Sequence, residues 1–271
     1  FICRTIPTCD FLHVGTTAQL LDLARGDSRL RDGAPAPHAP IILATSGRAH
    51  LISARGSWID ACRFAAPVTL KGQNVLVGVE SDSPLTLPPR WGLTIIPIGP
   101  RRLVPIAFGL TDDFKSDVEA GATLGGRPLA PLIDRLGGND SIWPDHASNP
   151  AAPRTLFNAR LWPVATSRAH ALSLIRWLWS HSPGSTRRPS RAWLTSDRVS
   201  LAEAILRCDR QLLLTHRAAL AKHHAAESLS HERSAARHHP SPSIRASHLW
   251  IASEHAADLR RDPRPLQTRA L

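Results

Sequence analysis

Within residues 41–108, a large apolar side chain recurs at every sixth position from Ile52 to Leu76, and this spacing restricts the folds open to the chain more than any other feature. A step of six is typical of a parallel β-helix, in which three short strands form each turn and one bulky side chain per strand fills the interior. Tight corners in such a coil favour glycine, which adopts positive φ without strain. The spacing therefore predicts a short left-handed parallel β-helix over residues 41–110, unless the matches arise by chance in a strand-rich segment. The apolar positions are Ile52, Trp58, Phe64, Leu70 and Leu76, and the candidate corners are Gly56, Gly72 and Gly78.

The pattern changes after this segment. Residues 93–98 and 103–108 are predicted strands, joined by residues 99–102 in the manner of a hairpin loop. Beyond Asp113 the apolar residues adopt helical spacing, first over 129–136 and again over 169–179. A further helix is expected to start at Ser200, where Glu203 completes a capping box, and to run towards Leu220.

The domain organisation follows from these changes. Residues 32–40 contain three prolines and are predicted to form an extended linker. The β-helix over 41–110 is followed by a mainly helical segment over 111–224, and residues 225–271 form a His/Arg-rich basic tail that we expect to be flexible. The fold class is therefore mixed β and α, a β-helix followed by a helical segment and a basic tail.

Charge is distributed unevenly along the chain. Residues 1–150 are neutral, with 14 basic and 14 acidic side chains, so residues 151–271 carry the entire net charge of +11. A basic half is able to bind nucleic acid, but the basic residues of the last forty positions are not interleaved with a row of stacking aromatic residues, and a solvated helical surface is favoured. No apolar run approaches the roughly 18 residues that span a membrane. The 4 scattered cysteines form no CxxC pair, which fits a reducing cytoplasm. The absence of Met, even at position 1, leads us to expect a fragment of a longer chain.

Three groups of residues are candidates for chemistry. Asp112-Asp113 follows a predicted strand and suits a cation bound to a nucleotide, although on the residues alone a turn and helix cap is favoured. The turn at 15–17, close to His13, presents backbone N–H groups to a phosphate, but ordinary strand-end turns have the same composition. The spacing of three histidines resembles a metal site without carboxylate or thiolate partners, so we assign no metal ligand there. These histidines are His216, His223 and His231. Because no GxxxxGK[ST], GxSxG or HExxH motif occurs, we assign no catalytic residue.

Five segments in order resemble one family. These segments are Phe-Leu-His-Val-Gly-Thr-Thr at 11–17, Phe-Gly-Leu-Thr-Asp-Asp-Phe-Lys at 108–115, Thr-Leu-Gly-Gly-Arg-Pro-Leu at 123–129, Leu-Phe-Asn-Ala-Arg-Leu-Trp-Pro-Val at 156–164, and the Trp…Ser-Leu-x-Glu entry to a helix at 193–203. Together they resemble the fucose salvage enzymes, which are GDP-fucose pyrophosphorylases (fucose-1-phosphate guanylyltransferases) and bifunctional fucokinase/GDP-fucose pyrophosphorylases. The β-helix of that family lies between the first two segments, where the six-residue step occurs.

This resemblance implies a cytoplasmic transferase that makes GDP-fucose from fucose 1-phosphate and GTP. Residues 1–31 would then be the end of a nucleotidyltransferase domain. His13 and Thr16 are the first candidates for contacts to the sugar phosphate, and Asp112 and Asp113 are the second. The resemblance also implies that the intact enzyme uses Mg²⁺ and GTP (or ATP). The family's glycine-rich nucleotide-binding segment and its kinase domain have no counterpart in this sequence, so we expect the chain to be inactive alone.

Two other functions stay open from the residues. One is a non-catalytic β-helix scaffold or anion-binding module, in which the β-helix mediates oligomerisation and the basic half binds an anionic partner. The other is an acyltransferase of the six-residue-repeat type, for which His50 would be the general-base candidate nearby. Neither alternative requires a membrane, and nucleic acid is not favoured as a partner.

Overall fold

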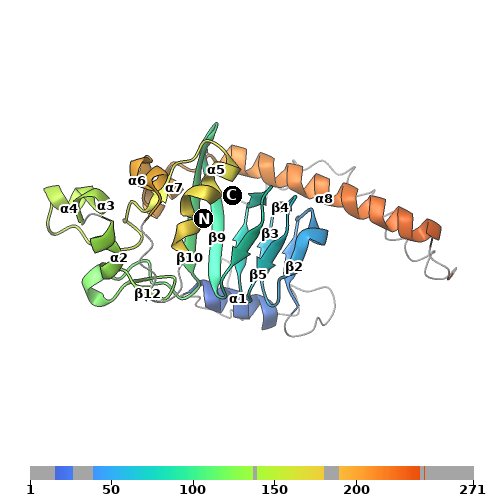
Figure 1. Cartoon of the computed structure of the whole chain (residues 1–271), viewed down its shortest axis with the longest axis horizontal. Helices are drawn as coiled ribbons and strands as arrows, with labels where there is room; N and C mark the ends of the chain where they lie inside the picture. Colours follow the sequence, from blue (N-terminus) through green and yellow to red (C-terminus); the bar gives the residue numbers. More distant parts are fainter. Residues whose placement is uncertain (1–15, 27–38, 137–138, 180–188, 239–240, 242–271) are drawn as a thin grey trace, which may run out of the picture.

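A computed structural model describes residues 16–26, 39–136, 139–179, 189–238 and 241. A coil of short strands forms its middle, the small helices α2, α3 and α4 lie at one end, and the long helix α8 runs along one edge of the coil and continues past it (Figure 1). The predicted architecture, a parallel β-helix followed by helices, is confirmed. No helix in the described part of the chain is long and apolar enough to cross a membrane.

The coil is a parallel β-solenoid of about three rungs with three faces. One face continues into a hairpin, giving the strand order β1-β3-β6-β9-β10, and the other faces are β2-β5-β8 and β4-β7. All pairs are parallel except β9 with β10, which form the predicted antiparallel hairpin. The strands are β1 (Ile41–Leu43), β2 (Leu51–Ser53), β3 (Trp58–Asp60), β4 (Arg63–Phe64), β5 (Val68–Leu70), β6 (Val75–Val77), β7 (Glu80–Ser81), β8 (Leu85–Leu87), β9 (Trp91–Gly99) and β10 (Arg102–Gly109).

Each rung contains 17 residues, whereas three steps of six residues would give a rung of 18, one residue too long. In the preceding rung, the residue that pairs with Leu76 is Ile59 and not Trp58. Phe64, Leu70 and Leu76 fill the interior as predicted, but Ile52 is 69% exposed and Trp58 is half-buried. These two assignments were wrong because a shift of one residue turns a strand side chain to the opposite face of the sheet.

Two columns of left-handed corners produce the shorter rung. One column consists of Ala44, Ala61 and Gly78, and the other consists of Gly56, Gln73 and Arg90, with φ between 42° and 68° in each case. The glycines predicted to stand at corners all have positive φ, Gly72 included. Four of the six column positions hold residues other than glycine, and each of them costs about 1 kcal/mol of backbone strain.

Short elements and helices follow the hairpin, and one helix precedes the solenoid. The first helix is α1 (Thr17–Gly26), and the first rung contains the 3₁₀ helix η2 (Arg48–His50). The remaining elements are η3 (Val118–Ala120), β11 (Thr123–Leu124), β12 (Arg127–Pro128), α2 (Ala130–Arg135), α3 (Asn139–Ile142), α4 (Pro144–Ser148), β13 (Trp162–Pro163), α5 (Arg168–Ile175), η4 (Arg176–Leu178), α6 (Arg191–Thr195), β14 (Arg198–Val199), α7 (Leu201–Leu206) and α8 (Arg210–His238).

The helix expected from Ser200 to Leu220 is two helices. The capping box at Ser200 and Glu203 is present, but α7 ends at Leu206. A new helix starts because Asp209 caps it, accepting the Leu212 N–H at 2.9 Å, while the Asp209 N–H donates to Pro97 O in β9. Helix α8 then continues past residue 225 to His238, so the first part of the predicted tail is helical.

Candidate functional site

The candidate residues near the N-terminus meet the end of the hairpin. Thr16 caps α1, because its hydroxyl oxygen accepts the Gln19 N–H at 3.3 Å while its own N–H donates to Gln19 Oε1 at 3.1 Å. In the first turn of α1, the Ala18 N–H donates to Leu110 O at 3.0 Å. This bond places Thr16 beside the segment that contains Asp112 and Asp113. His13 lies outside the described residues.

Asp112 is a buried carboxylate that binds two loops together. Its oxygens accept N–H groups from Gly109 at 2.6 Å, Gly125 at 2.7 Å and Gly126 at 3.0 Å, and the Thr123 hydroxyl at 3.0 Å. Burial raises the pKa of the Asp112 carboxyl, and the four donors oppose this increase. The side chain therefore joins the end of β10 to the turn between β11 and β12.

Asp113 is exposed and organises the following turn. Its Oδ1 accepts the N–H groups of Lys115 and Ser116 at 2.8 and 3.1 Å, and its Oδ2 accepts the Ser116 hydroxyl at 2.5 Å. The hydroxyl and the two amides hold the pKa of the Asp113 carboxyl below its usual value. Both carboxylates thus have hydrogen-bond partners within the chain, as expected for turn and cap residues.

The family-like segments are joined to one another by direct hydrogen bonds. The segment at 108–115 holds 123–129 through Asp112, and its Phe114 O accepts the Phe157 N–H at 3.0 Å. Phe157 O in turn accepts the Ala202 N–H at 3.1 Å. Arg160 adds a two-point ion pair to Glu203, at 2.7 and 3.1 Å. Segments far apart in sequence therefore form one connected unit beside the solenoid.

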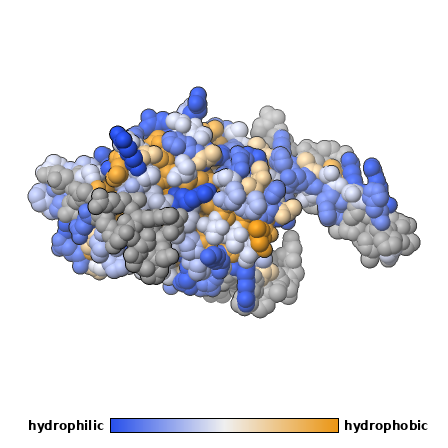
Figure 2. Space-filling view, viewed as in Figure 1, coloured by the Kyte–Doolittle hydropathy of each residue, from blue (hydrophilic) through white to orange (hydrophobic). Residues whose placement is uncertain are grey.

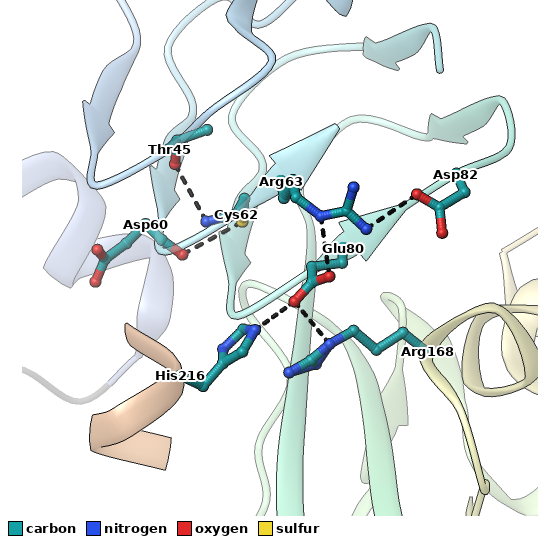
Figure 3. A network of polar contacts seen from close by, with 8 residues as sticks. All are labelled: Thr45, Asp60, Cys62, Arg63, Glu80, Asp82, Arg168 and His216. Atoms are coloured by element: carbon teal, nitrogen blue, oxygen red, sulfur yellow. Dashed lines mark hydrogen bonds and ion pairs between the residues drawn. The ribbon is translucent and has the colours of Figure 1, made fainter. Parts of the chain in front are cut away.

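A second polar cluster centres on Glu80 of strand β7 in the solenoid (Figure 3). The Glu80 carboxylate, only 15% exposed, accepts Arg63 Nε at 3.1 Å and pairs with Arg168 Nε of α5 at 2.8 Å. His216 of α8 also bonds to it, and Arg63 reaches on to Asp82 at 3.1 Å. This carboxylate attaches both α5 and α8 to the third rung.

The electrostatics of this cluster disfavour Glu80 as a proton donor and Cys62 as a reactive thiol. Burial alone would raise the pKa of Glu80, but the hydrogen bond from His216 and the charges of Arg168 and Arg63 lower it to about 2. Burial raises the pKa of the nearby Cys62 thiol to about 12. At neutral pH, Glu80 is ionised and Cys62 is protonated, so the cluster is a structural joint.

Sequence reasoning missed the pairing of Glu80 with Arg63 because this pairing becomes visible only with the correct repeat length. Arg63 and Glu80 are 17 residues apart and lie side by side on β4 and β7. The same spacing joins Ser57 to Asn74, whose buried amide also bonds to Trp91 O at 3.1 Å. A search for partners at 17-residue spacing would have found both pairs.

Metal-binding geometry is lacking in the described part of the chain, where no group of three or more His, Cys, Asp or Glu residues is arranged to hold an ion. Of the three histidines that share a helical face in the sequence, His216 contacts Glu80, whereas His223 and His231 are exposed.

A family model described as a fucose pyrophosphorylase domain matches residues 3–167, which is more than half of the chain. The chain belongs to the fucose pyrophosphorylase family. The match contains α1, the whole solenoid, the hairpin and the Asp112 joint. The resemblance inferred from the five segments is therefore confirmed.

The chain is 29% identical to a curated relative, the bifunctional fucokinase/GDP-fucose pyrophosphorylase of Arabidopsis thaliana. The alignment covers 71% of this chain and 20% of the relative. The chain thus spans about a fifth of the length of that relative. No solved structure matches the chain.

Proposed function

We propose that this chain is part of a fucose salvage enzyme that makes GDP-fucose from fucose 1-phosphate and GTP. The observation that carries the proposal is the match of residues 3–167 to the fucose pyrophosphorylase domain. The relative named as a fucokinase/GDP-fucose pyrophosphorylase supports the same substrate class. In this reaction a phosphate oxygen of fucose 1-phosphate attacks the α-phosphorus of GTP. A new P–O bond forms, the bond to the β-phosphate oxygen breaks, and pyrophosphate leaves.

Among the candidate residues that the structure describes, Thr16 is the one that we assign to contact the sugar phosphate. Its hydroxyl oxygen accepts one hydrogen bond from Gln19, so its proton remains for donation to a phosphate oxygen. The positive end of the α1 dipole lies at the same place and favours an anion there. Asp112 and Asp113 would act indirectly, by shaping the loop that follows Leu110. His13 is the neighbouring candidate by sequence.

In this proposal, the chain binds the sugar phosphate and other parts of the enzyme bind the nucleotide. The sequence contains no GxxxxGK[ST] loop, so we assign no triphosphate-binding loop to it. Mg²⁺, which offsets phosphate charge during nucleotidyl transfer, would be bound with the nucleotide. We therefore expect the isolated chain to bind fucose 1-phosphate but not to release pyrophosphate.

Calorimetric titration with fucose 1-phosphate tests this proposal. Thr16→Val removes one hydrogen bond to a charged group and should weaken binding about tenfold, whereas Thr16→Ser keeps the hydroxyl and should bind normally. Thr86→Val, in the exposed middle of β8, is the matched control and should have no effect. Unchanged binding by Thr16→Val would refute the role of Thr16. Absence of fucose 1-phosphate binding by the chain would refute the proposed function, whereas pyrophosphate release by the chain alone would contradict only the expectation that it is inactive by itself.

A further inference from the structure

The first rung of the solenoid has an open edge. Among the residues that the structure describes, β1 pairs only with β3 and β2 pairs only with β5, so each is the last described strand of its sheet. The apolar side chains at this edge are exposed, Leu43 by 41% and Ile52 by 69%. Open strand edges template pairing with other chains, and repeat coils need caps at their ends. This end of the solenoid therefore requires a device that blocks association.

Arg48 supplies part of that device. After the corner of the first rung, its side chain turns back across the open edge. Its Nη2 donates to Ile42 O at 3.3 Å and its Nε donates to Thr45 O at 3.3 Å. A strand that paired with β1 from outside would need the Ile42 carbonyl for its own hydrogen bonds. The guanidinium occupies that acceptor and places a positive charge at the edge.

Helix α8 contacts Arg48 and the neighbouring Gly47 at this corner of the first rung. His224 Nε2 lies 3.0 Å from Arg48 Nη2, and because arginine only donates, the histidine nitrogen accepts. Three residues further along, Glu227 Oε2 accepts the Gly47 N–H at 3.0 Å. Both contacts come from the part of α8 that passes the first rung.

The same helix is attached to the other rungs. His216 bonds to Glu80 on the third rung, and Arg217 pairs with Asp60 on the second at 2.8 Å. The helix therefore crosses all three rungs, and Figure 1 shows it continuing past β2 at the open end. In the view of Figure 2 this projecting end is mostly hydrophilic, unlike the strands beside it, where hydrophobic side chains reach the surface.

We propose that Arg48 and α8 form a cap that prevents the open edge of one copy from pairing with the same edge of a second copy. A two-fold axis would bring β1 and β2 of each copy against those of the other, with Leu43 and Ile52 burying one another. While the cap is closed, the Ile42 and Thr45 carbonyls are occupied and the two Arg48 guanidinium groups repel each other. Opening the cap exposes a self-complementary edge.

Sedimentation velocity on the full chain tests the cap. Arg48→Ala uncovers both carbonyls and removes the repelling charge, and it should raise the self-association constant about tenfold or more over the wild type. Glu227→Ala leaves the Gly47 N–H without its acceptor and should act in the same direction. Because the Glu227 side chain is 43% exposed on α8, its removal does not disturb the core. Arg55→Ala is the matched control, an exposed arginine of the same rung, and should not change association.

A second substitution identifies the surface. Ile52→Lys, added to Arg48→Ala, should return association to the wild-type level, because two lysines would then meet across the edge. The cap is refuted if neither Arg48→Ala nor Glu227→Ala increases association, or if Arg55→Ala increases it equally. It is also refuted if the association of Arg48→Ala persists with Ile52→Lys, since the copies would then meet at another surface.

Discussion

Glu80 is the carboxylate that attaches α5 and α8 to the third rung of the solenoid, and removal of its charge should destabilise the protein. Glu80→Gln keeps the shape of the side chain but removes the charge that faces Arg63, Arg168 and His216. A carboxyl whose pKa falls from 4.5 to about 2 on folding stabilises the protein by about 3 kcal/mol at neutral pH, and solvent screening leaves about 2 kcal/mol. For a domain of this size that loss lowers Tm by about 4–8 °C.

The pH dependence of this loss has a definite sign. Because folding lowers the pKa of Glu80, its contribution is complete above about pH 4.5 and disappears as the pH falls towards 2. Urea denaturation followed by circular dichroism measures the free energy of unfolding of both proteins. The difference between wild type and Glu80→Gln should be about 2 kcal/mol at pH 7 and should fall below about 1 kcal/mol at pH 3.

Asp82 provides a matched control in the same cluster. It pairs with Arg63 at 3.1 Å, but its side chain is 63% exposed, so Asp82→Asn should cost no more than about 1 kcal/mol. Equal losses for the Glu80 and Asp82 variants, or a Glu80 loss that does not change between pH 7 and pH 3, would refute this reasoning.

Three further stability predictions use the same denaturation assay. Asp112→Ala leaves the buried Gly109 amide and the more accessible amides of Gly125 and Gly126 without an acceptor and should cost about 3 kcal/mol, while Asp112→Asn, which keeps one oxygen, should cost less. Gly125→Ala places a methyl group 2.1 Å from Trp91 at positive φ and should cost more than Gly121→Ala, which meets nothing; similar losses would contradict the steric argument. Asn74→Ala removes the hydrogen bonds to the carbonyl oxygens of Pro88 and Trp91 and should cost about 2 kcal/mol; a loss below about 0.5 kcal/mol would show that these bonds contribute little.

The solenoid was predictable because its interior is apolar and some of its corners are glycines. The rung length was not, because Ala61, Gln73 and Arg90 also occupy left-handed corners, and such residues carry no sequence mark of that conformation. An 18-residue repeat therefore fitted Leu70 and Leu76 but placed Ile52 on the wrong face.

The candidate site was predictable only at the level of local turns. The Thr16 cap and the Asp113 turn use partners within three residues, which a sequence pattern reveals. The Asp112 joint, by contrast, depends on the turn at Gly125 and Gly126 lying against the end of β10. Such contacts follow from the tertiary fold and not from local spacing, which is also why His216 was not paired with Glu80.

The proposed function requires this member of the fucose pyrophosphorylase family to bind fucose 1-phosphate. The most direct measurement compares fucose 1-phosphate with glucose 1-phosphate, which carries the same charge, by calorimetric titration of the 271-residue chain. We predict saturable binding of fucose 1-phosphate at least about tenfold tighter than that of glucose 1-phosphate. Equal affinities for the two would indicate an unspecific anion site and would contradict this requirement.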